Sequence, residues 1–340
     1  MYDVVTIGDV FQDLFIFSDD FKVIVDRSFK SGKSLSFDYG AKIDINKLEY
    51  HTGGSANNSA LSFAKVGLST SIVSFLGLDS FGEKILSELD DAGVNTGNMK
   101  CNNKSTNTSI ILSSHGDRTI LSYHGENDYS HLPIAKNLKT KWFYLAPIGK
   151  EINQLENKIV ENIAKNGSGL IWNPGPSQIK FGAKSFRHLL RLTNILFLNR
   201  EETLTFSDSG QMQVESSMKI LHDFGAKIIV VTDGAKGTKC FDGSVFYQIE
   251  ATDDKRIDAT GAGDSFASSF SAVIIHDCDA KKPQSHIPER KIIEQALKSG
   301  IIVSGSVVSK IGAHSGLISL AEIANREKKL VKLQPTIYTK

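Results

Sequence analysis

Residues 258 to 264 read Asp-Ala-Thr-Gly-Ala-Gly-Asp, which places two carboxylates on either side of a turn of small residues. Apolar side chains from Phe266 to Ile274 then recur at helical spacing, so a helix is expected to follow this turn. A glycine-rich turn at a helix start directs unpaired backbone N–H groups, and the positive end of the helix dipole, toward one point. Such a point binds anions, most often phosphate. A carboxylate at Asp264 has a chemical use there if it accepts a proton from the group that attacks the phosphate.

The same stretch has a plainer interpretation, because aspartate is common in the first turn of a helix and Gly-Ala-Gly is also a tight connection. Two familiar nucleotide-binding motifs are absent. A dinucleotide fingerprint needs a third glycine where Phe266 stands. Gly32-Lys33-Ser34 is not a Walker loop, because Arg27 occupies the position of its first glycine. The function of the turn therefore depends on what the rest of the chain brings beside it.

The composition predicts an ordinary globular protein. The chain has 340 residues, of which 40% are hydrophobic and 23% charged, and its formal net charge is +1. We therefore expect no nucleic-acid partner and no membrane partner, and no apolar run reaches the ~18 residues of a membrane helix. The three cysteines have no metal-binding spacing, and the N-terminus has no basic region of a signal peptide. These features favour a reducing, cytoplasmic location.

Segments with strand and helix patterns alternate along most of the chain. Strands are expected at 2–7, 71–76, 142–145, 169–172, 195–198 and 227–232, with a hairpin through 241–243. Helices are expected at 59–66, 81–92, about 152–165, 185–190, 214–224 and after Asp264, and a last one at about 289–303. This alternation predicts an α/β fold whose mostly parallel central sheet carries helices on both faces. Ligands of such sheets bind beyond the carboxyl ends of the strands.

Two insertions interrupt the alternation. In residues 14–51, Lys42 to Ile45 alternates like a half-exposed strand. In residues 103–126, two segments rich in β-formers flank a turn at His115-Gly116-Asp117. We expect both insertions to form a small β lid. Residues 1–13, 52–102 and 127–340 would then form the large domain that binds nucleotide and substrate.

Polar or glycine-rich segments follow two of the later strands. Asn199 and Glu202 could hold magnesium through water, because Mg²⁺ prefers oxygen ligands and keeps most of its own waters. The alternative is a helix cap with solvated charges, which the segment alone favours. The segment from Thr232 to Gly237 lets a planar or anionic ligand approach its backbone, or serves as a hairpin connection.

Polar side chains also stand near the beginning of the chain. Asp9 and Asp13 follow the first strand and could accept hydrogen bonds from sugar hydroxyls. Gly53-Gly54 leads into a helix on which the amide of Asn58 is exposed, or whose Asn and Ser residues act as ordinary N-caps. Their use as a ligand site requires that they lie near the turn at 258–264.

Taken together and in order, Gly53-Gly54 with Asn58, Asn199-x-x-Glu202 and the 258–264 turn resemble the ribokinase-like (phosphofructokinase-B type) carbohydrate kinases. The resemblance covers nearly the whole chain, and the three motifs together are specific. It implies an ATP-dependent small-molecule kinase with a large α/β domain and a β lid.

The resemblance also implies a role for each matching residue. Asp264 would be the catalytic base for the substrate hydroxyl, and the backbone anion hole for the transferring phosphoryl group would comprise Gly261, Ala262 and Gly263. Asn199 and Glu202 would organise magnesium and phosphate, and the ATP site would be lined by Thr232, Gly234 and Gly237. Substrate hydroxyls would be held by Asp13, Gly54 and Asn58. Potassium would bind beside the anion hole at Asp258 and Thr260, with the 309–315 loop completing the site.

The sequence departs from ribokinases at Phe11, where they carry a polar Asn. This argues against ribose and admits an acceptor with an apolar part. We expect ATP-dependent phosphorylation of a primary hydroxyl of a sugar or sugar-like molecule. The alternative is a nucleoside kinase of the same family. A non-catalytic nucleotide sensor would have lost the base, and Asp264 is present. A homodimer is expected through the strand edges of the lid, unless these edges are capped.

Overall fold

A computed structural model of the chain describes residues 1–29, 32–102, 104–114, 117–125, 134, 138–149, 153–210, 213–278 and 283–340. His115 and Gly116, where a hairpin turn is predicted, lie outside these ranges, as do positions 103 and 126 of the second insertion.

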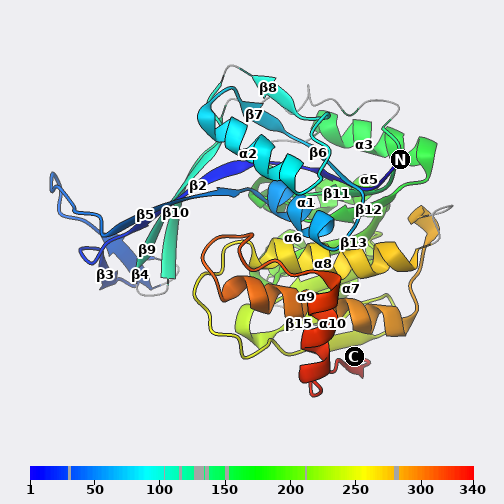
Figure 1. Cartoon of the computed structure of the whole chain (residues 1–340). Helices are drawn as coiled ribbons and strands as arrows, with labels where there is room; N and C mark the ends of the chain where they lie inside the picture. The colour runs from blue at the N-terminus through cyan, green and yellow to red at the C-terminus, as the bar shows by residue number, and fades with distance from the viewer. Residues whose placement is uncertain are drawn as a thin grey trace.

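A nine-stranded sheet forms the centre of the molecule (Figure 1). In spatial order its strands are β17 (Thr336–Tyr338), β16 (Phe246–Ile249), β15 (Thr238–Phe241), β14 (Ile228–Thr232), β13 (Thr193–Asn199), β12 (Gly169–Trp172), β11 (Thr140–Leu145), β1 (Tyr2–Ile7) and β6 (Thr70–Val73). The strands from β6 to β14 pair in parallel, and β15, β16 and β17 are added antiparallel. The predicted α/β fold with a mostly parallel sheet is therefore confirmed.

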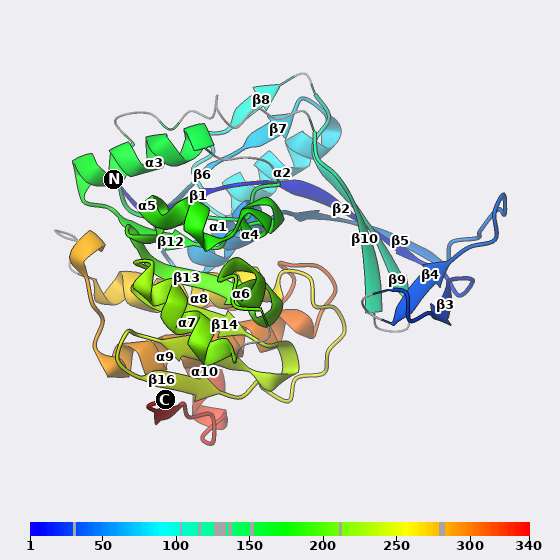
Figure 2. The same cartoon turned by 180° about the vertical axis from the view of Figure 1, so that it is seen from behind.

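Helices cover both faces of this sheet (Figures 1 and 2). One face carries α1 (Ser55–Lys65), α2 (Ser80–Asp91), α8 (Ala262–Asp277), α9 (Arg290–Val308) and α10 (Leu320–Lys329). The other carries α3 (Asn153–Asn166), α4 (Pro176–Phe181), α5 (Arg187–Leu190), α6 (Arg200–Phe206) and α7 (Val214–Asp223). Short 3-10 turns are η2 (Ala183–Phe186), η3 (Gly234–Lys236) and η4 (Pro283–Ser285). None of the helices in the described part of the chain is long and apolar enough to span a membrane.

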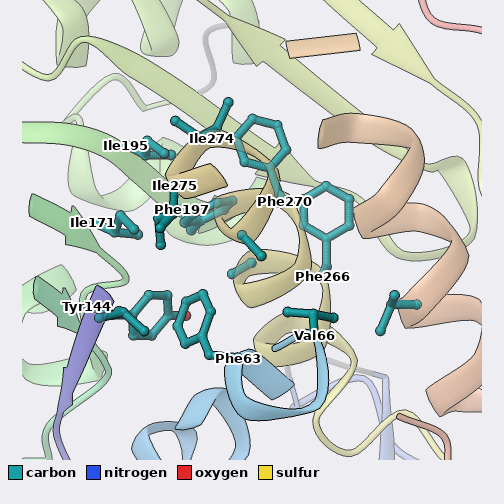
Figure 3. Close-up of a cluster of buried hydrophobic side chains, with 14 of the residues drawn as sticks. Phe63, Val66, Tyr144, Ile171, Ile195, Phe197, Phe266, Phe270, Ile274 and Ile275 are labelled. Atoms are coloured by element: carbon teal, nitrogen blue, oxygen red, sulfur yellow. The ribbon is translucent and has the colours of Figure 1, made fainter. Parts of the chain in front are cut away.

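Two buried clusters hold these layers together, because each strand sends alternate side chains to opposite faces. In β11, Trp142 and Tyr144 join one cluster, whereas Phe143 and Leu145 join the other. The first cluster seats α8 against the sheet, and Figure 3 shows its aromatic rings between α1, α8 and the strands. The Phe197 ring lies 5.5 Å from that of Phe270 in edge-to-face contact. These contacts fix the helix that carries the 258–264 turn.

A separate small sheet projects from this body (Figure 2). Its order is β10 (Asp117–Tyr123), β9 (Thr108–Ser114), β2 (Phe11–Phe17) and β5 (Lys47–Gly53), and β3 (Lys22–Val25) with β4 (Lys33–Ser36) forms a two-stranded hairpin beside it. β7 (Phe75–Gly77) and β8 (Lys100–Asn102) form another short pair. Because β2 begins at Phe11, both Phe11 and Asp13 lie in the small sheet.

Several predicted elements were wrong in position. Lys42 to Ile45 is not a strand; this segment lies along the loop after β2, where the Ser18 hydroxyl donates a hydrogen bond to the Asp44 carbonyl. The strand expected at 71–76 is broken at Ser74, whose hydroxyl donates to the Gly8 carbonyl at 2.6 Å. The helix at 59–66 begins at Ser55.

The helix expected to be the last, at 289–303, is followed by α10 and β17. The Ser319 side chain caps α10, and Glu322 Oε2 accepts a hydrogen bond from the Ser319 N–H at 2.7 Å. This Ser-x-x-Glu pattern was the available sequence signal. The short helices α4 and α6 were also not predicted.

Candidate active site

The candidate residues gather at the carboxyl edge of the parallel strands. Asp9 follows β1, Asn199 ends β13 and Thr232 ends β14. Asn199 and Thr232 are direct partners in the sheet register. The 258–264 turn meets this edge through α8, so the sheet brings together segments that are far apart in the sequence.

The start of α8 is open. Gly261 is its N-cap with a left-handed φ of 74°, and no side chain caps the helix. The first helical bond runs from the Ser265 N–H to the Gly261 carbonyl at 2.9 Å, so the N–H groups of residues 262–264 precede the helical ladder. Ala262 donates to the Ala259 carbonyl at 3.3 Å, whereas Gly263 is exposed, with no atom within 4 Å of the position of a Cβ. Backbone donors therefore remain available here.

Gly261 is also required by its surroundings. A Cβ at this position would overlap Ala313, in the loop after α9. The φ value adds strain for any residue with a side chain. The turn thus holds its shape only with glycine at 261.

Asp264 lies in the first turn of α8 and faces α1. Its Oδ2 accepts a hydrogen bond from the Asn58 amide at 2.7 Å. The two helices are pinned nearby by the Ser268 hydroxyl, which donates to Ser62 at 2.6 Å. Burial raises the pKa of the Asp264 carboxyl above its usual value, against the opposing effects of Asn58, Ser55 and His314. A carboxylate with a raised pKa is a stronger base than an ordinary aspartate.

A second corner of the site forms where β2, β5 and α1 meet. Gly54 has a φ of 88°, and a Cβ there would lie 2.6 Å from the Asp9 carbonyl oxygen. Asp9 Oδ2 accepts from the Gly149 N–H at 3.0 Å. A Cβ on Gly53 would overlap the Asp13 carboxylate. The close approach of these backbones brings Asp9, Asp13 and Asn58 into one corner, as the sequence motifs suggested.

Asp13 is buried in this corner, with 5% of its surface exposed. Burial raises the pKa of Asp13 to about 6, although the hydrogen bond from Ser109 and the charges of His314 and His51 act in the opposite direction. Such a carboxylate holds its charge at a cost in folding free energy.

The segment after β13 forms a helix cap. Asn199 Oδ1 accepts from the Glu202 N–H at 2.8 Å, and Glu202 Oε2 accepts from the Asn199 N–H at 2.8 Å. This capping box is the alternative that the segment alone favoured. The pKa of Glu202 is raised, chiefly by burial and further by the charges of Glu201 and Asp264, against the lowering effect of Asn199. Glu202 therefore lies close enough to Asp264 to interact with it.

The segment after β14 forms a tight turn. Gly234 and Gly237 have φ values of 54° and 85°, and a Cβ on Gly237 would overlap the Ile249 carbonyl. A cavity of about 210 Å³ adjoins this turn. It is lined by Arg200, Val214, Val231, Asp233, Lys236, Gly237, Thr238, Lys239 and Gln248. The cationic residues here were not singled out from the sequence.

Asp258 ties the turn to the loop after α9. Its Oδ1 accepts from the Thr260 N–H and hydroxyl at 3.0 and 2.8 Å, and its Oδ2 accepts from the Gly312 N–H at 3.0 Å. Across the described ranges, no group of three or more His, Cys, Asp or Glu side chains is placed to hold a metal ion.

Sequence reasoning missed several side chains around Asp264. His314 Nε2 lies 2.6 Å from Asn58 Oδ1, and Glu88 lies behind it. The buried Tyr144 hydroxyl has its pKa raised by burial and by the charge of Asp264. None of these belongs to a motif; His314 directly follows the Gly312-Ala313 pair that packs on Gly261 and Asp258.

The chain matches a family model described as pfkB family carbohydrate kinase, over residues 3–319. The chain belongs to this family. It is therefore a phosphotransferase of the sugar kinase type, as the resemblance implied, and more broadly a sugar or nucleoside kinase. A cytidine kinase from Thermococcus kodakarensis is 29% identical over 280 residues, which cover 80% of this chain and 88% of that protein.

Solved structures share the fold of this pfkB family member. A ribokinase from Giardia lamblia superposes with a TM-score of 0.79 at 20% identity, covering 96% of this chain and 100% of that chain. A ribokinase from Arabidopsis thaliana, complexed with ribose and ATP, gives a TM-score of 0.71 at 20% identity, covering 95% and 98%. These likenesses confirm the predicted ribokinase-like fold.

Proposed function

We propose that this kinase transfers the γ-phosphoryl group of ATP to a hydroxyl, a primary one, of a sugar or sugar-like molecule, with Asp264 as the general base. One observation carries the proposal. Asp264 stands in the first turn of a helix whose leading N–H groups precede its hydrogen-bond ladder, and Asn58 holds one of its oxygens at 2.7 Å. A base and a set of anion donors thus share one point.

The chemical step needs little from the protein beyond position and charge. The acceptor hydroxyl gives its proton to Asp264, its oxygen bonds to the γ-phosphorus, and the bond from that phosphorus to the ADP oxygen breaks. The backbone N–H groups of Gly261, Ala262 and Gly263 would stabilise the charge on the transferring group, with the Ala262 N–H exchanging its 3.3 Å bond to the Ala259 carbonyl for the phosphoryl oxygen. The raised pKa of Asp264 supports its role, because proton acceptance becomes more favourable as the transfer proceeds.

The nucleotide would lie along the ends of β13 and β14. We assign Asn199, Thr232, Gly234 and Gly237 to ATP, since the glycine turn lets a ligand approach the backbone closely. We assign Glu202 to magnesium held through water, because burial, with a further contribution from the charge of Asp264, raises the pKa of its carboxyl, and a nearby divalent cation would stabilise the charged form. When bound, Mg²⁺ neutralises phosphate charge.

We assign potassium to Asp258 and Thr260. The Asp258 carboxylate accepts three hydrogen bonds, which leaves about one of its four lone-pair sites for a cation. The loop at 309–315 would supply carbonyl oxygens. Turnover measured with potassium and with tetramethylammonium tests this assignment: equal rates would remove it.

The acceptor would lie between the start of α8 and the corner where β2, β5 and α1 meet. Asp9 and Asp13 would accept hydrogen bonds from its hydroxyls, beside Gly54 and Asn58. The second candidate function is a nucleoside kinase. It is favoured by Phe11, which contacts the His124 ring edge-to-face at 5.2 Å where ribokinases carry a polar residue, and by the likeness to a cytidine kinase.

A panel of ribose, fructose, adenosine, inosine and cytidine at matched concentrations separates the two functions. We expect transfer to a sugar with the highest kcat/KM. A nucleoside preferred by more than tenfold would select the second function. The variant Asp264→Asn, run on the best acceptor, should bind ATP normally and lose at least ~10³-fold in kcat. Near-normal turnover would end the assignment of the base.

We also propose a homodimer through the lid. The edge strands β5 and β10 expose Leu48, Tyr50, Ile120, Leu121 and Tyr123. Burying this apolar surface between two copies would stabilise them both. Sedimentation of the wild type and of Leu121→Lys tests this; a wild type that stays monomeric at micromolar concentration would contradict it.

A further inference from the structure

A chain of four side chains leads from the solvent to Asp264. Glu88 Oε1 lies 3.3 Å from His314 Nδ1, and His314 Nε2 lies 2.6 Å from Asn58 Oδ1. Asn58 Nδ2 then donates to Asp264 Oδ2 at 2.7 Å. The four residues come from α2, the loop after α9, α1 and α8, so four separate elements meet in this chain.

The donor and acceptor directions in this chain follow from its chemistry. Ionised Asp264 only accepts, so Asn58 must turn its NH₂ group toward it and its carbonyl oxygen toward His314. A carbonyl oxygen also only accepts, so His314 Nε2 must carry a hydrogen. If Asn58 were flipped, its oxygen would face the Asp264 carboxylate and its NH₂ would face the His314 N–H. With a hydrogen on Nε2, both contacts of the flipped amide would be repulsive, so the Nε2–H of His314 adds to Asp264 in holding the observed orientation.

His314 is itself held from behind. Its Nδ1 lies 3.3 Å from both Glu88 and the Thr52 hydroxyl, and Thr52 is also hydrogen-bonded to Glu88. Burial acts to raise the pKa of Glu88, but the hydrogen bonds from His314 and Thr52 outweigh it, and the pKa lies below its usual value. The ring is 14% exposed and cannot easily turn away from Asn58.

We propose that His314, braced by Glu88, is a positioning residue that locks the Asn58 amide and so aims the Asp264 carboxylate at the acceptor hydroxyl. The inference rests on the proposed role of Asp264 as the base. Asn58 holds Asp264 Oδ2, and the Ser55 side chain also hydrogen-bonds this carboxylate, so the position of the Asn58 amide helps to set the direction of the carboxylate. Without the lock, the amide samples both orientations, and for part of the time the carboxylate loses the Asn58 donor and keeps only that of Ser55.

The chain of contacts also borders a cavity. This cavity, of about 430 Å³, is lined by Tyr50, His51, Thr52, Lys84, Ser87, Glu88, Asp91, His314 and Ser315. Water can therefore reach Glu88 and the Nδ1 side of His314, whereas Asn58 is only 6% exposed. The Nε2 contact is the protected one, and it carries the positioning effect.

Two amide substitutions distinguish the two sides of the ring. His314→Gln keeps an N–H near the position of Nε2, facing Asn58, and His314→Asn keeps one near Nδ1, facing Glu88. His314→Leu removes both. We expect kcat to fall about tenfold in His314→Leu and His314→Asn, with the KM for ATP within twofold of wild type, because small errors in position are costly in the chemical step. His314→Gln should recover most of the lost kcat.

Controls separate positioning from stability and from the base assignment. The exposed His276 at the other end of α8 provides a matched substitution, His276→Leu, and thermal melts of all variants report folding. Combining His314→Leu with Asn58→Leu should cost little more than Asn58→Leu alone, because both act on the same bond.

The proposal is overturned if His314→Leu keeps kcat within twofold, or if His314→Gln loses as much as His314→Leu. Asp264→Asn measured alongside keeps the two claims apart. If Asp264→Asn stays active, the base assignment fails; if it is inactive while His314→Leu is fully active, only the positioning role fails. If His314→Leu does not fold, the comparison of His314→Asn with His314→Gln still decides.

Discussion

Two helices begin at the carboxyl edge of the sheet, and they begin in opposite ways. The start of α6 is closed by its own side chains, since Asn199 and Glu202 each accept a hydrogen bond from the backbone of the other at 2.8 Å. The start of α8 has a left-handed glycine, no side-chain cap and donors that precede its ladder. A helix that satisfies its own first turn needs no ligand there, whereas one left open is suited to an anion.

This difference separates two sequence motifs that look equally functional in the chain. The Asn-x-x-Glu motif caps the start of α6, and it leaves only the second carboxylate oxygen of Glu202 for a ligand. The 258–264 turn uses the N–H groups of Thr260 and Ala262 internally, but it exposes Gly263 at the uncapped helix start and adds a carboxylate whose pKa burial raises. Substitutions at the two helix starts should therefore have different consequences.

Apart from the removal of the Asp264 carboxylate, the largest expected effect comes from distorting the open start. Gly261→Ala would force a side chain onto Ala313 and onto a φ of 74°. We expect kcat to fall by about 10²-fold and the free energy of unfolding to fall by about 1 kcal/mol. Steady-state kinetics and urea unfolding measure both.

Gly263→Ala is the matched control for stability, because nothing lies within 4 Å of its Cβ position. We expect its unfolding free energy to stay equal or rise slightly. If the two variants have the same free energy of unfolding, the turn does not depend on the left-handed backbone and close packing at Gly261.

A second buried carboxylate, Asp13, sharpens the comparison, because burial raises its pKa as it raises that of Asp264. Above pH 6, the folded protein keeps Asp13 charged at a cost, because its pKa is raised from 3.8 to about 6. The folded state binds this proton more tightly than the unfolded state, so the contribution of Asp13 to stability is present below pH 4 and is lost as the pH rises to about 6.

Asp13→Asn should therefore stabilise the protein at pH 8 by roughly 2 kcal/mol and change it little at pH 3.5. Its kcat/KM for the acceptor should fall at the same time. Thermal melts at the two pH values measure the first effect. A variant less stable than wild type at pH 8 would contradict the prediction.

The smallest effect is expected from opening the closed start. Asn199→Ala removes the cap of α6 and should cost about 1 kcal/mol of stability. Asn199→Asp keeps a capping oxygen and should restore that loss. Differential scanning calorimetry compares the three proteins. If Asn199→Ala leaves stability unchanged and instead reduces turnover as strongly as Gly261→Ala, the contrast between the helices fails.

The fold could be predicted because its strands are apolar and buried on both faces. β12 was predicted residue for residue at 169–172, and β1 at 2–7. The errors occur where a tertiary contact overrides a local pattern. Ser74 breaks a continuous apolar run by bonding to Gly8, and Lys42 to Ile45 has the alternation of a strand but pairs with no strand in the part of the chain that the structure describes.

The candidate site was predictable only as far as its motifs extend. Glycines and carboxylates at fixed spacing indicated the 258–264 turn and the corner that contains Asp9, Asp13 and Asn58. His314 and Glu88 belong to no motif, and the contacts of His314 with Asn58 and Glu88 span 256 and 226 residues. Such contacts exist only once α1, α2, α8 and the loop after α9 are packed together, and no local pattern encodes them.

The central claim is that the chemistry of this kinase takes place at the open start of α8. It is tested most directly by the rate of phosphoryl transfer from ATP in a single turnover, measured by rapid quench for Asp264→Asn and Glu202→Gln beside the wild type. We expect this rate to fall at least ~10³-fold in Asp264→Asn and about tenfold in Glu202→Gln. A single-turnover rate for Asp264→Asn within tenfold of wild type would contradict the account.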